Sequence, residues 1–346
     1  MMTETVIVTG ASGFIAQHCI IQLLEAGYDV RGTLRSPKRE QEVRDAIDGA
    51  VPGGGDRVSF AYVDLTGDDG WDEAMAGCTY LLHVASPFPL AEPQDESEVI
   101  RPAVDGALRA LQAAARAGVK RTVLTSSLAA IMYGHNGRER PFDEHDWSNL
   151  SGDGISAYAK SKTLAEKAAW DFISTPRNRG MELAVINPGL VLGPVTTPDT
   201  STSMEPLVQM MSGQMPALPR LSFPVVDVRD VAAAHIAAMT EPEAAGKRFC
   251  CAVDELWFKD ISDIIREPMA AHGIKVPTAV LPDFAVRLFA LFRPDLKALL
   301  PDLGIERKIN NMQIRRVLNW SPRGAEEATL AAAESLVATG VVKAKS

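Results

Sequence analysis

Short runs of β-branched and apolar residues alternate with helical segments through the first half of the chain, and this order constrains the fold most. The pattern predicts strands over residues 5–9, 29–34, 58–63, 80–84, 121–125 and 183–187, and helices over 14–26, 99–117 and 155–173. Such an order builds right-handed βαβ units that join in one parallel sheet. Four of the predicted strands contain almost continuously apolar runs, as expected when helices cover both faces: VIV, VSFAYV, YLLHVA and TVLT. The sequence therefore predicts an α/β fold with a doubly wound parallel sheet.

Charge and composition exclude several kinds of partner. The chain has 346 residues and a formal net charge of -9 without a basic block, so nucleic acid and anionic membranes are not expected partners. No stretch has the apolar length of a signal peptide or a membrane span, and we expect a cytoplasmic monomer or homodimer. The scattered cysteines fit neither a metal site nor a disulfide framework, so no metal is expected; they are Cys19, Cys78, Cys250 and Cys251.

A glycine-containing loop, GASGFIA at residues 10–16, joins the first predicted strand to the first predicted helix. One glycine would permit the tight turn and the other a close approach to a pyrophosphate, which the free N–H groups of the helix N-terminus would bind. Because the loop opens a full α/β repeat, we interpret it as the dinucleotide-binding turn of a Rossmann domain. The residues expected to contact the cofactor here are Gly10, Ser12, Gly13, Phe14 and Ile15.

A basic segment at the end of the second predicted strand bears on the choice of nucleotide. NAD-binding proteins usually carry an Asp or Glu about twenty residues after the glycine loop, but no carboxylate occurs from residue 30 to 39. A guanidinium here can pair with a 2′-phosphate, so we predict NADPH/NADP+ as the cofactor. Arg35 is the first candidate, followed by Lys38, Arg31 and Ser36. The alternative is a solvated basic loop.

The third predicted strand is followed by Asp64 and Leu65, which are expected beside the adenine. The Asp64 carboxylate can accept a hydrogen bond from the exocyclic amine of adenine. An Asp at the end of a strand also commonly caps a turn or helix. Both interpretations stay open.

Three side chains are candidates for carbonyl chemistry. Tyr158 and Lys162 are four residues apart in a predicted helix and project from one face. A neighbouring ammonium and an oxidised nicotinamide would lower the pKa of the phenol, so that Tyr158 could protonate an alkoxide formed by hydride transfer. Ser126 and Ser127 follow a strand, at the edge where open α/β sheets bind ligands. One of these hydroxyls can donate to the substrate oxygen, and the other is expected only to satisfy backbone groups.

Together these segments resemble the extended short-chain dehydrogenase/reductase family, and within it dihydroflavonol reductases, cinnamoyl-CoA reductases and related ketone and aldehyde reductases. The resemblance covers about residues 4–260 and rests on TGASGFIA, LLHVASPF, VLTSS, AYAKSKTLAEKAAW, INPGLVLGP and PVVDVRDVAAAH. It implies that Ser127 is the catalytic hydroxyl, that Tyr158 donates the proton and that Lys162 tunes its pKa. It also implies cofactor contacts at Val84, Ala85, Ser86, Ser126, Pro188, Gly189, Val191 and Ser203.

Two segments are not assigned the function that the resemblance would suggest: the first departs from the family pattern, and the second is explained by a structural role. Cinnamoyl-CoA reductases commonly carry an NWYCY-like stretch at the catalytic tyrosine, whereas residues 154–158 read GISAY, which argues against a CoA thioester substrate. The DVRD segment at residues 227–230 is expected to be scaffold, with Asp230 capping a helix and Arg229 forming an ion pair.

Prolines interrupt the alternation between residues 188 and 224. Residues 225–231 are expected to return to the sheet as a strand, with a helix over 232–239 and a helix-rich remainder. We therefore predict an NADP-binding Rossmann domain formed by residues 1–188 and 224–250. A smaller, mostly helical substrate-binding cap would comprise residues 189–223 and 251–346.

The expected substrate is an apolar or aromatic aldehyde or ketone, because apolar and Met-rich segments are expected around the site. The substrate contacts predicted are Phe88, Ala129, Met132, Tyr133 and Phe223. A hydroxysteroid dehydrogenase or a sugar-nucleotide epimerase would share the same residues, but such epimerases usually favour NAD, which the basic segment opposes. A non-catalytic NADP-binding regulator is the alternative of another class, although such proteins generally lose the Tyr or the Lys.

Overall fold

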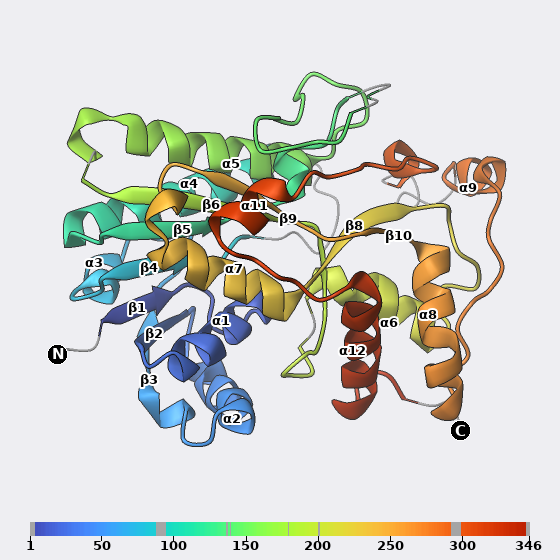
Figure 1. The fold of residues 1–346 in the computed structure, drawn as a ribbon, viewed down its shortest axis with the longest axis horizontal. Helices are drawn as coiled ribbons and strands as arrows, with labels where there is room; N and C mark the ends of the chain where they lie inside the picture. The colour runs from blue at the N-terminus through green and yellow to red at the C-terminus, as the bar shows by residue number, and fades with distance from the viewer. Residues whose placement is uncertain are drawn as a thin grey trace.

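The computed structural model describes residues 4–87, 95–135, 138, 140–178, 180–199, 201–291 and 299–343. Within these residues the larger sheet is parallel and has the order β3-β2-β1-β4-β5-β6-β9, which confirms the predicted doubly wound α/β fold (Figure 1). Its strands are β1 (Thr5–Val8), β2 (Asp29–Leu34), β3 (Val58–Tyr62), β4 (Tyr80–His83), β5 (Arg121–Thr125), β6 (Glu182–Pro188) and β9 (Arg248–Cys251). The winding reverses between β1 and β4, and ligands bind at such a crevice in open α/β sheets.

Helices cover both faces of this sheet, as the continuous apolar strands predicted. One face carries α1 (Phe14–Glu25), α2 (Glu40–Ala50) and α7 (Val228–Thr240), and the other carries α3 (Trp71–Met75), α4 (Ser97–Ala117) and α5 (Ala157–Ser174) (Figure 1). Successive residues of a strand point to opposite faces, so Val6 and Val8 pack beneath α1 while Ile7 packs beneath α4.

A smaller, mostly helical region lies beside the carboxyl edge of the sheet (Figure 1). It contains a second sheet of β7 (Leu190–Leu192), β8 (Ser222–Asp227) and β10 (Glu255–Trp257). Its helices are α6 (Glu205–Ser212), α8 (Phe258–Ala271), α9 (Asp283–Phe289), α11 (Met312–Val317) and α12 (Ala325–Ala338). The exact division of the chain into domains stays a prediction.

Two local expectations were wrong. Residues 225–231 do not return to the large sheet: β8 pairs with β7 and β10, α7 already begins at Val228, and β9 occupies the edge beside β6. The cap of α7 is Asp227, whose side chain accepts from the Arg229 N–H, because the helix begins at Val228, two residues before Asp230. Asp230 instead forms an ion pair with Arg323 at 2.6 Å. Arg229 is an ion-pair partner, as expected, and binds Asp227 at 2.6 Å.

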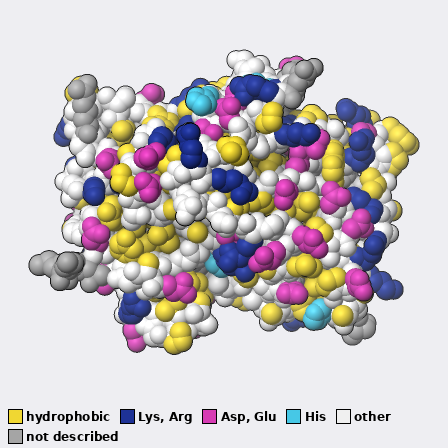
Figure 2. Space-filling view, in the orientation of Figure 1, with side chains coloured by type: hydrophobic (Ala, Val, Ile, Leu, Met, Phe, Trp, Pro, Cys, Tyr) yellow, Lys and Arg dark blue, Asp and Glu magenta, His cyan; other side chains and the backbone are white. Residues whose placement is uncertain are grey.

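Figure 2 shows acidic and basic side chains interspersed over the visible face of the molecule rather than gathered by sign. Among the described residues, no helix is long and apolar enough to cross a membrane. The same residues include no group of three or more His, Cys, Asp or Glu side chains arranged to hold a metal ion.

Candidate active site

A cleft of about 740 Å³ runs along the carboxyl ends of the parallel strands. Most of the site residues expected from the sequence line it, namely Gly10, Ser12, Gly13, Phe14, Ile15, Arg35, Asp64, Leu65, Val84, Ala85, Ser86, Ser126, Ser127, Ala129, Met132, Tyr133, Tyr158, Lys162, Pro188, Gly189, Val191, Ser203 and Phe223. Lys38 is exposed in the short helical turn Pro37–Arg39 and does not belong to this lining. Phe88 lies outside the described residues.

The glycine loop forms a cradle that fits a pyrophosphate. Gly10 has a φ of +70°, and a Cβ there would come within 3.0 Å of the Ala85 Cβ. The loop is fixed to β2, because the Gly10 N–H donates to the Thr33 hydroxyl at 3.0 Å. Helix α1 begins at Phe14, and no side chain caps its first turn. The N–H groups of that turn lack helical partners and face an anion favourably.

The three arginines near the end of β2 have different surroundings. Arg31 donates to the Ala74 carbonyl oxygen at 2.7 Å, and Arg39 forms an ion pair with Asp199 at 2.6 Å. Arg35 is exposed at the cleft and has no hydrogen bond or ion pair with another described residue. Its guanidinium therefore fits a 2′-phosphate, whereas Arg31 serves the scaffold.

Asp64 forms a local turn at the end of β3. Its Oδ1 accepts from the Thr66 N–H at 2.8 Å and from the Thr66 hydroxyl at 2.7 Å. These hydrogen bonds lower the pKa of the Asp64 carboxyl. The turn interpretation is therefore observed directly. Asp64 also lines the cleft, so it is placed where it could reach the adenine, and that contact stays a prediction.

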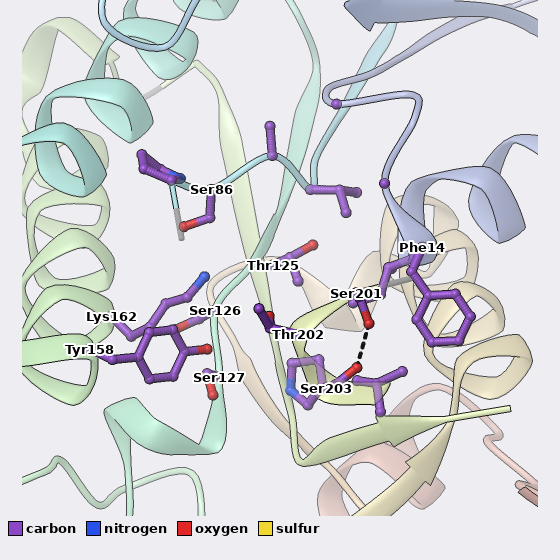
Figure 3. A pocket seen from close by; sticks show the side chains of 18 of the residues that line it. Phe14, Ser86, Thr125, Ser126, Ser127, Tyr158, Lys162, Ser201, Thr202 and Ser203 are labelled. Atoms are coloured by element: carbon purple, nitrogen blue, oxygen red, sulfur yellow. Dashed lines mark hydrogen bonds between the residues drawn. The ribbon is translucent and has the colours of Figure 1, made fainter. Parts of the chain in front are cut away.

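Tyr158 and Lys162 extend from α5 into the cleft, and the hydroxyls of Tyr158 and Ser127 lie close together (Figure 3). The Lys162 Nζ lies 6.0 Å from the centroid of the Tyr158 ring. Ser127 forms a hydrogen bond with the phenol. Ser156 caps the start of α5 by accepting from the Ala159 N–H at 3.2 Å. This cap fixes the helix two residues before Tyr158.

Burial dominates the acid–base properties of this pair. It raises the pKa of the Tyr158 phenol, and the hydrogen bond from Ser127 acts in the opposite direction. Burial lowers the pKa of Lys162 from 10.5 to about 8, and the Glu166 carboxylate counteracts that fall. The lowered phenol pKa expected from the sequence also required an oxidised nicotinamide, so that expectation applies to the complex with the cofactor.

The two serines after β5 have different partners. The Ser126 hydroxyl is buried and donates to Glu166 Oε2 at 2.6 Å. The Ser127 hydroxyl accepts from the Ala129 N–H at 3.0 Å and meets Tyr158 at the cleft. Because Ser126 is committed to a buried carboxylate, the geometry favours Ser127 as the hydroxyl that reaches a substrate.

Several lining residues had not been expected from the sequence. On the nucleotide side these are Thr33, Leu34, Val63, Thr66 and Trp71, and near the serines they are Thr125 and Pro224. Opposite the glycine loop, Ser201 and Ser203 share a hydrogen bond of 2.6 Å (Figure 3). Pro224 enters the cleft because β8 crosses closely over Gly189, where a Cβ would lie 2.1 Å from the Pro224 carbonyl oxygen.

The chain is similar to a known protein family and to several of its reductases. The model of the NAD dependent epimerase/dehydratase family matches residues 6–252. Cinnamoyl-CoA reductase 1 of Arabidopsis thaliana is 36% identical over 249 residues, which are 70% of this chain and 69% of that protein. Dihydroflavonol 4-reductase of Zea mays is 32% identical over 281 residues, which are 78% of this chain and 76% of that protein.

A solved structure extends the likeness to nearly the whole chain. Yeast methylglyoxal/isovaleraldehyde reductase Gre2 in complex with NADPH superimposes with a TM-score of 0.79 at 29% identity, covering 98% of this chain and 100% of that one. The match reaches beyond the Rossmann sheet into the C-terminal helices. The chain thus belongs to the NAD dependent epimerase/dehydratase family, the extended short-chain dehydrogenase/reductases that its motifs resemble.

Proposed function

We propose that this protein is an NADPH-dependent reductase that converts an apolar or aromatic aldehyde or ketone to the alcohol. The observation that carries the proposal is the convergence of Ser127, Tyr158 and Lys162 beside a nucleotide-sized cleft. The relatives support it, because they include NADPH-bound Gre2 and two further reductases. The exposed guanidinium of Arg35 at the cleft supports NADPH as the cofactor.

The three side chains divide the work at the carbonyl group. NADPH supplies a hydride to the carbonyl carbon when it is bound. Ser127 donates a hydrogen bond to the carbonyl oxygen, where negative charge develops. Tyr158 transfers its phenolic proton to that oxygen, which completes the alcohol. The Lys162 ammonium stabilises the phenolate that remains and so lowers the pKa that burial has raised.

The walls around the hydroxyls favour an apolar substrate. Ala129 and Met132 are buried at the cleft, and Phe223 packs against Phe258 with ring centroids 5.8 Å apart. The hydroxyl of Tyr133 is bonded to Asp302 of the C-terminal region, which leaves its ring as a wall. Among the described residues that line this end, few polar groups other than Ser127 and Tyr158 are available to recognise a sugar. Phe88 stays a predicted contact.

The test is turnover of a carbonyl panel, followed by the loss of NADPH absorbance. The panel contains isovaleraldehyde, methylglyoxal, benzaldehyde, an aryl ketone and cinnamoyl-CoA. We expect Tyr158→Phe to lower kcat by about 10²- to 10⁴-fold, the usual contribution of a positioned proton donor, and to leave the Kd for NADPH nearly unchanged.

Tyr62→Phe is the matched control, because Tyr62 is exposed and bonded to Glu40 outside the cleft. NADPH binding without turnover of any carbonyl would support the regulator instead. Turnover that survives in Tyr158→Phe would show that another residue donates the proton. Turnover restricted to cinnamoyl-CoA would overturn the substrate class proposed above.

A further inference from the structure

A buried carboxylate lies directly behind the proposed catalytic residues. Glu166 follows Lys162 by one helical turn and Tyr158 by two turns on α5, so the three side chains share a face. Its side chain is fully buried. The Oε2 atom accepts from the Ser126 hydroxyl at 2.6 Å, and the Oε1 atom accepts from the Trp170 indole N–H at 3.2 Å. From the sequence alone, no role was expected for this residue.

An equally buried cation neutralises Glu166. Arg248 of β9 donates to the carboxylate through Nε at 2.5 Å and through Nη2 at 3.3 Å. The guanidinium is itself fixed, because it donates to the Asp146 carbonyl oxygen at 2.7 Å and lies 3.7 Å from the centroid of the Trp147 ring. Such a partner compensates a buried carboxylate, and removal of the partner would leave an uncompensated buried charge. The charge therefore has a defined position in the fold.

A third polar residue connects this carboxylate to the second serine. Asn187 of β6 is fully buried, and its Nδ2 donates both to Glu166 Oε2 at 2.8 Å and to the Ser127 carbonyl oxygen at 3.1 Å. Glu166 thus holds the side chain of Ser126 directly and the backbone of Ser127 through Asn187. These bonds tie the turn after β5 to the helix that carries Tyr158.

Glu166 also faces Lys162. Both residues and His83 of β4 line a small pocket of about 20 Å³. Burial lowers the pKa of His83 to about 4, so this neighbour is neutral near pH 7, and Arg248 lies behind the carboxylate. Glu166 therefore supplies negative charge beside the ammonium and favours its protonated form.

We propose that Glu166 is a positioning residue of the reductase site, which holds the Ser126–Ser127 turn against α5 and keeps Lys162 charged. Through this turn, Glu166 sets where the Ser127 hydroxyl meets Tyr158. The proposal rests on the function proposed above, because it concerns the same three side chains. Glu166 itself does not line the nucleotide cleft, so it acts through its neighbours.

The test compares Glu166→Gln with Ser126→Ala in the full chain, using NADPH and the best carbonyl of the panel. Glu166→Gln keeps the size of the side chain but removes its charge. We expect kcat to fall by about tenfold to a hundredfold, since a displacement of about 1 Å can cost 10²-fold, with little change in the KM for NADPH. In the pH profile of kcat, the apparent pKa of the alkaline limb should fall by about one unit or more, because an opposite charge near Lys162 is lost. Ser126→Ala should lower kcat without moving that limb, since the carboxylate stays.

Asp230→Asn is the matched control for lost stability, because Asp230 is another buried, ion-paired carboxylate but lies outside the cleft. It should lower the melting temperature and leave kcat and the pH limb as in the wild type. Glu166→Gln with wild-type kcat and pH limb would overturn the proposal, as would a loss of kcat no larger than the loss of folded protein. Glu166→Asp should restore part of the kcat and return the limb toward the wild-type position.

If the wild type turns over no carbonyl, the proposed function fails first, and the ¹³Cε NMR titration of Lys162 still tests the role of Glu166. That signal is assigned by its absence from Lys162→Arg. An unchanged Lys162 titration in Glu166→Gln would overturn the electrostatic part of the proposal without any assay of turnover.

Discussion

Replacement of Arg35 by Ala tests the choice between NADPH and NADH. Arg35 is exposed at the cleft and has no hydrogen bond or ion pair with another described residue, so its loss should leave the fold intact. One hydrogen bond from Arg35 to the charged 2′-phosphate should contribute about 1.5–3 kcal/mol to the binding free energy. Solvent at this exposed position would weaken any additional contact between the two groups. At about 1.4 kcal/mol for each factor of ten, the Kd for NADPH should rise by roughly tenfold to a hundredfold. The Kd for NADH, which lacks the 2′-phosphate, should stay within about threefold.

Both constants are measured by fluorescence titration at one ionic strength, because salt screens exposed charges. Arg31→Ala is the matched control. It removes a cation of β2, the strand that Arg35 follows, and the Arg31 guanidinium donates to the Ala74 carbonyl oxygen at 2.7 Å. That variant should lose stability but should bind NADPH and NADH with an unchanged ratio of Kd values. Equal weakening of both cofactors in Arg35→Ala would refute the assignment of the 2′-phosphate to Arg35.

Two further predictions concern stability. Gly10→Ala should lower the free energy of unfolding by about 2–5 kcal/mol, because a left-handed φ costs about 1–2 and crowding about 1–3 kcal/mol. Its Cβ would meet Ala85 at 3.0 Å, whereas Gly27, with a φ of +87° and nothing within 4 Å, offers a control that isolates the backbone term in urea unfolding. For Lys162, a pKa that falls from 10.5 to about 8 on folding corresponds to about 3 kcal/mol. The unfolded chain binds the extra proton between about pH 8 and 10.5, so the contribution of Lys162 to stability rises with pH across that window. Lys162→Met should thus be more stable than the wild type at pH 7 by up to about 3 kcal/mol and lose that advantage toward pH 10.5. An equal difference at both pH values would contradict the lowered pKa.

The large sheet could be predicted from the sequence because its strands carry their own signal. Residues 29–34 and 121–125 were predicted with the bounds that β2 and β5 have in the structure. β5 is buried throughout, and β2 is buried at Val30 and from Gly32 to Leu34, as expected for strands covered by helices on both faces. Helices α2 and α3 were not assigned. Only Val43 and Ile47 of α2 are buried, and α3 has five residues, so neither has a long apolar stripe.

Strand partners could not be predicted in the same way. Residues 222–227 form a strand, as the β-branched run indicated in part, but that run contains no information on which edge it joins. The edge beside β6 is taken by β9, which begins at Arg248. A choice between two such strands depends on tertiary packing, which overrides local propensity. For the same lack of tertiary information, Asp230 was the expected cap of α7, whereas the observed cap is Asp227.

The catalytic candidates were accessible to sequence reasoning because Ser126 and Ser127 follow a strand, and Tyr158 lies one helical turn from Lys162. The residues behind them were not. Glu166 is four residues from Lys162 and could be placed on its face, but its partner Arg248 is 82 residues away and joins it only through the order of β6 and β9. Ser126 and Ser127 are adjacent in the chain, and the hydrogen bond to Glu166 is what separates their roles. The selection of one serine over its neighbour thus depends on a carboxylate that no local motif connects to it, so replacing Glu166 should change the behaviour of a site whose lining residues are all intact.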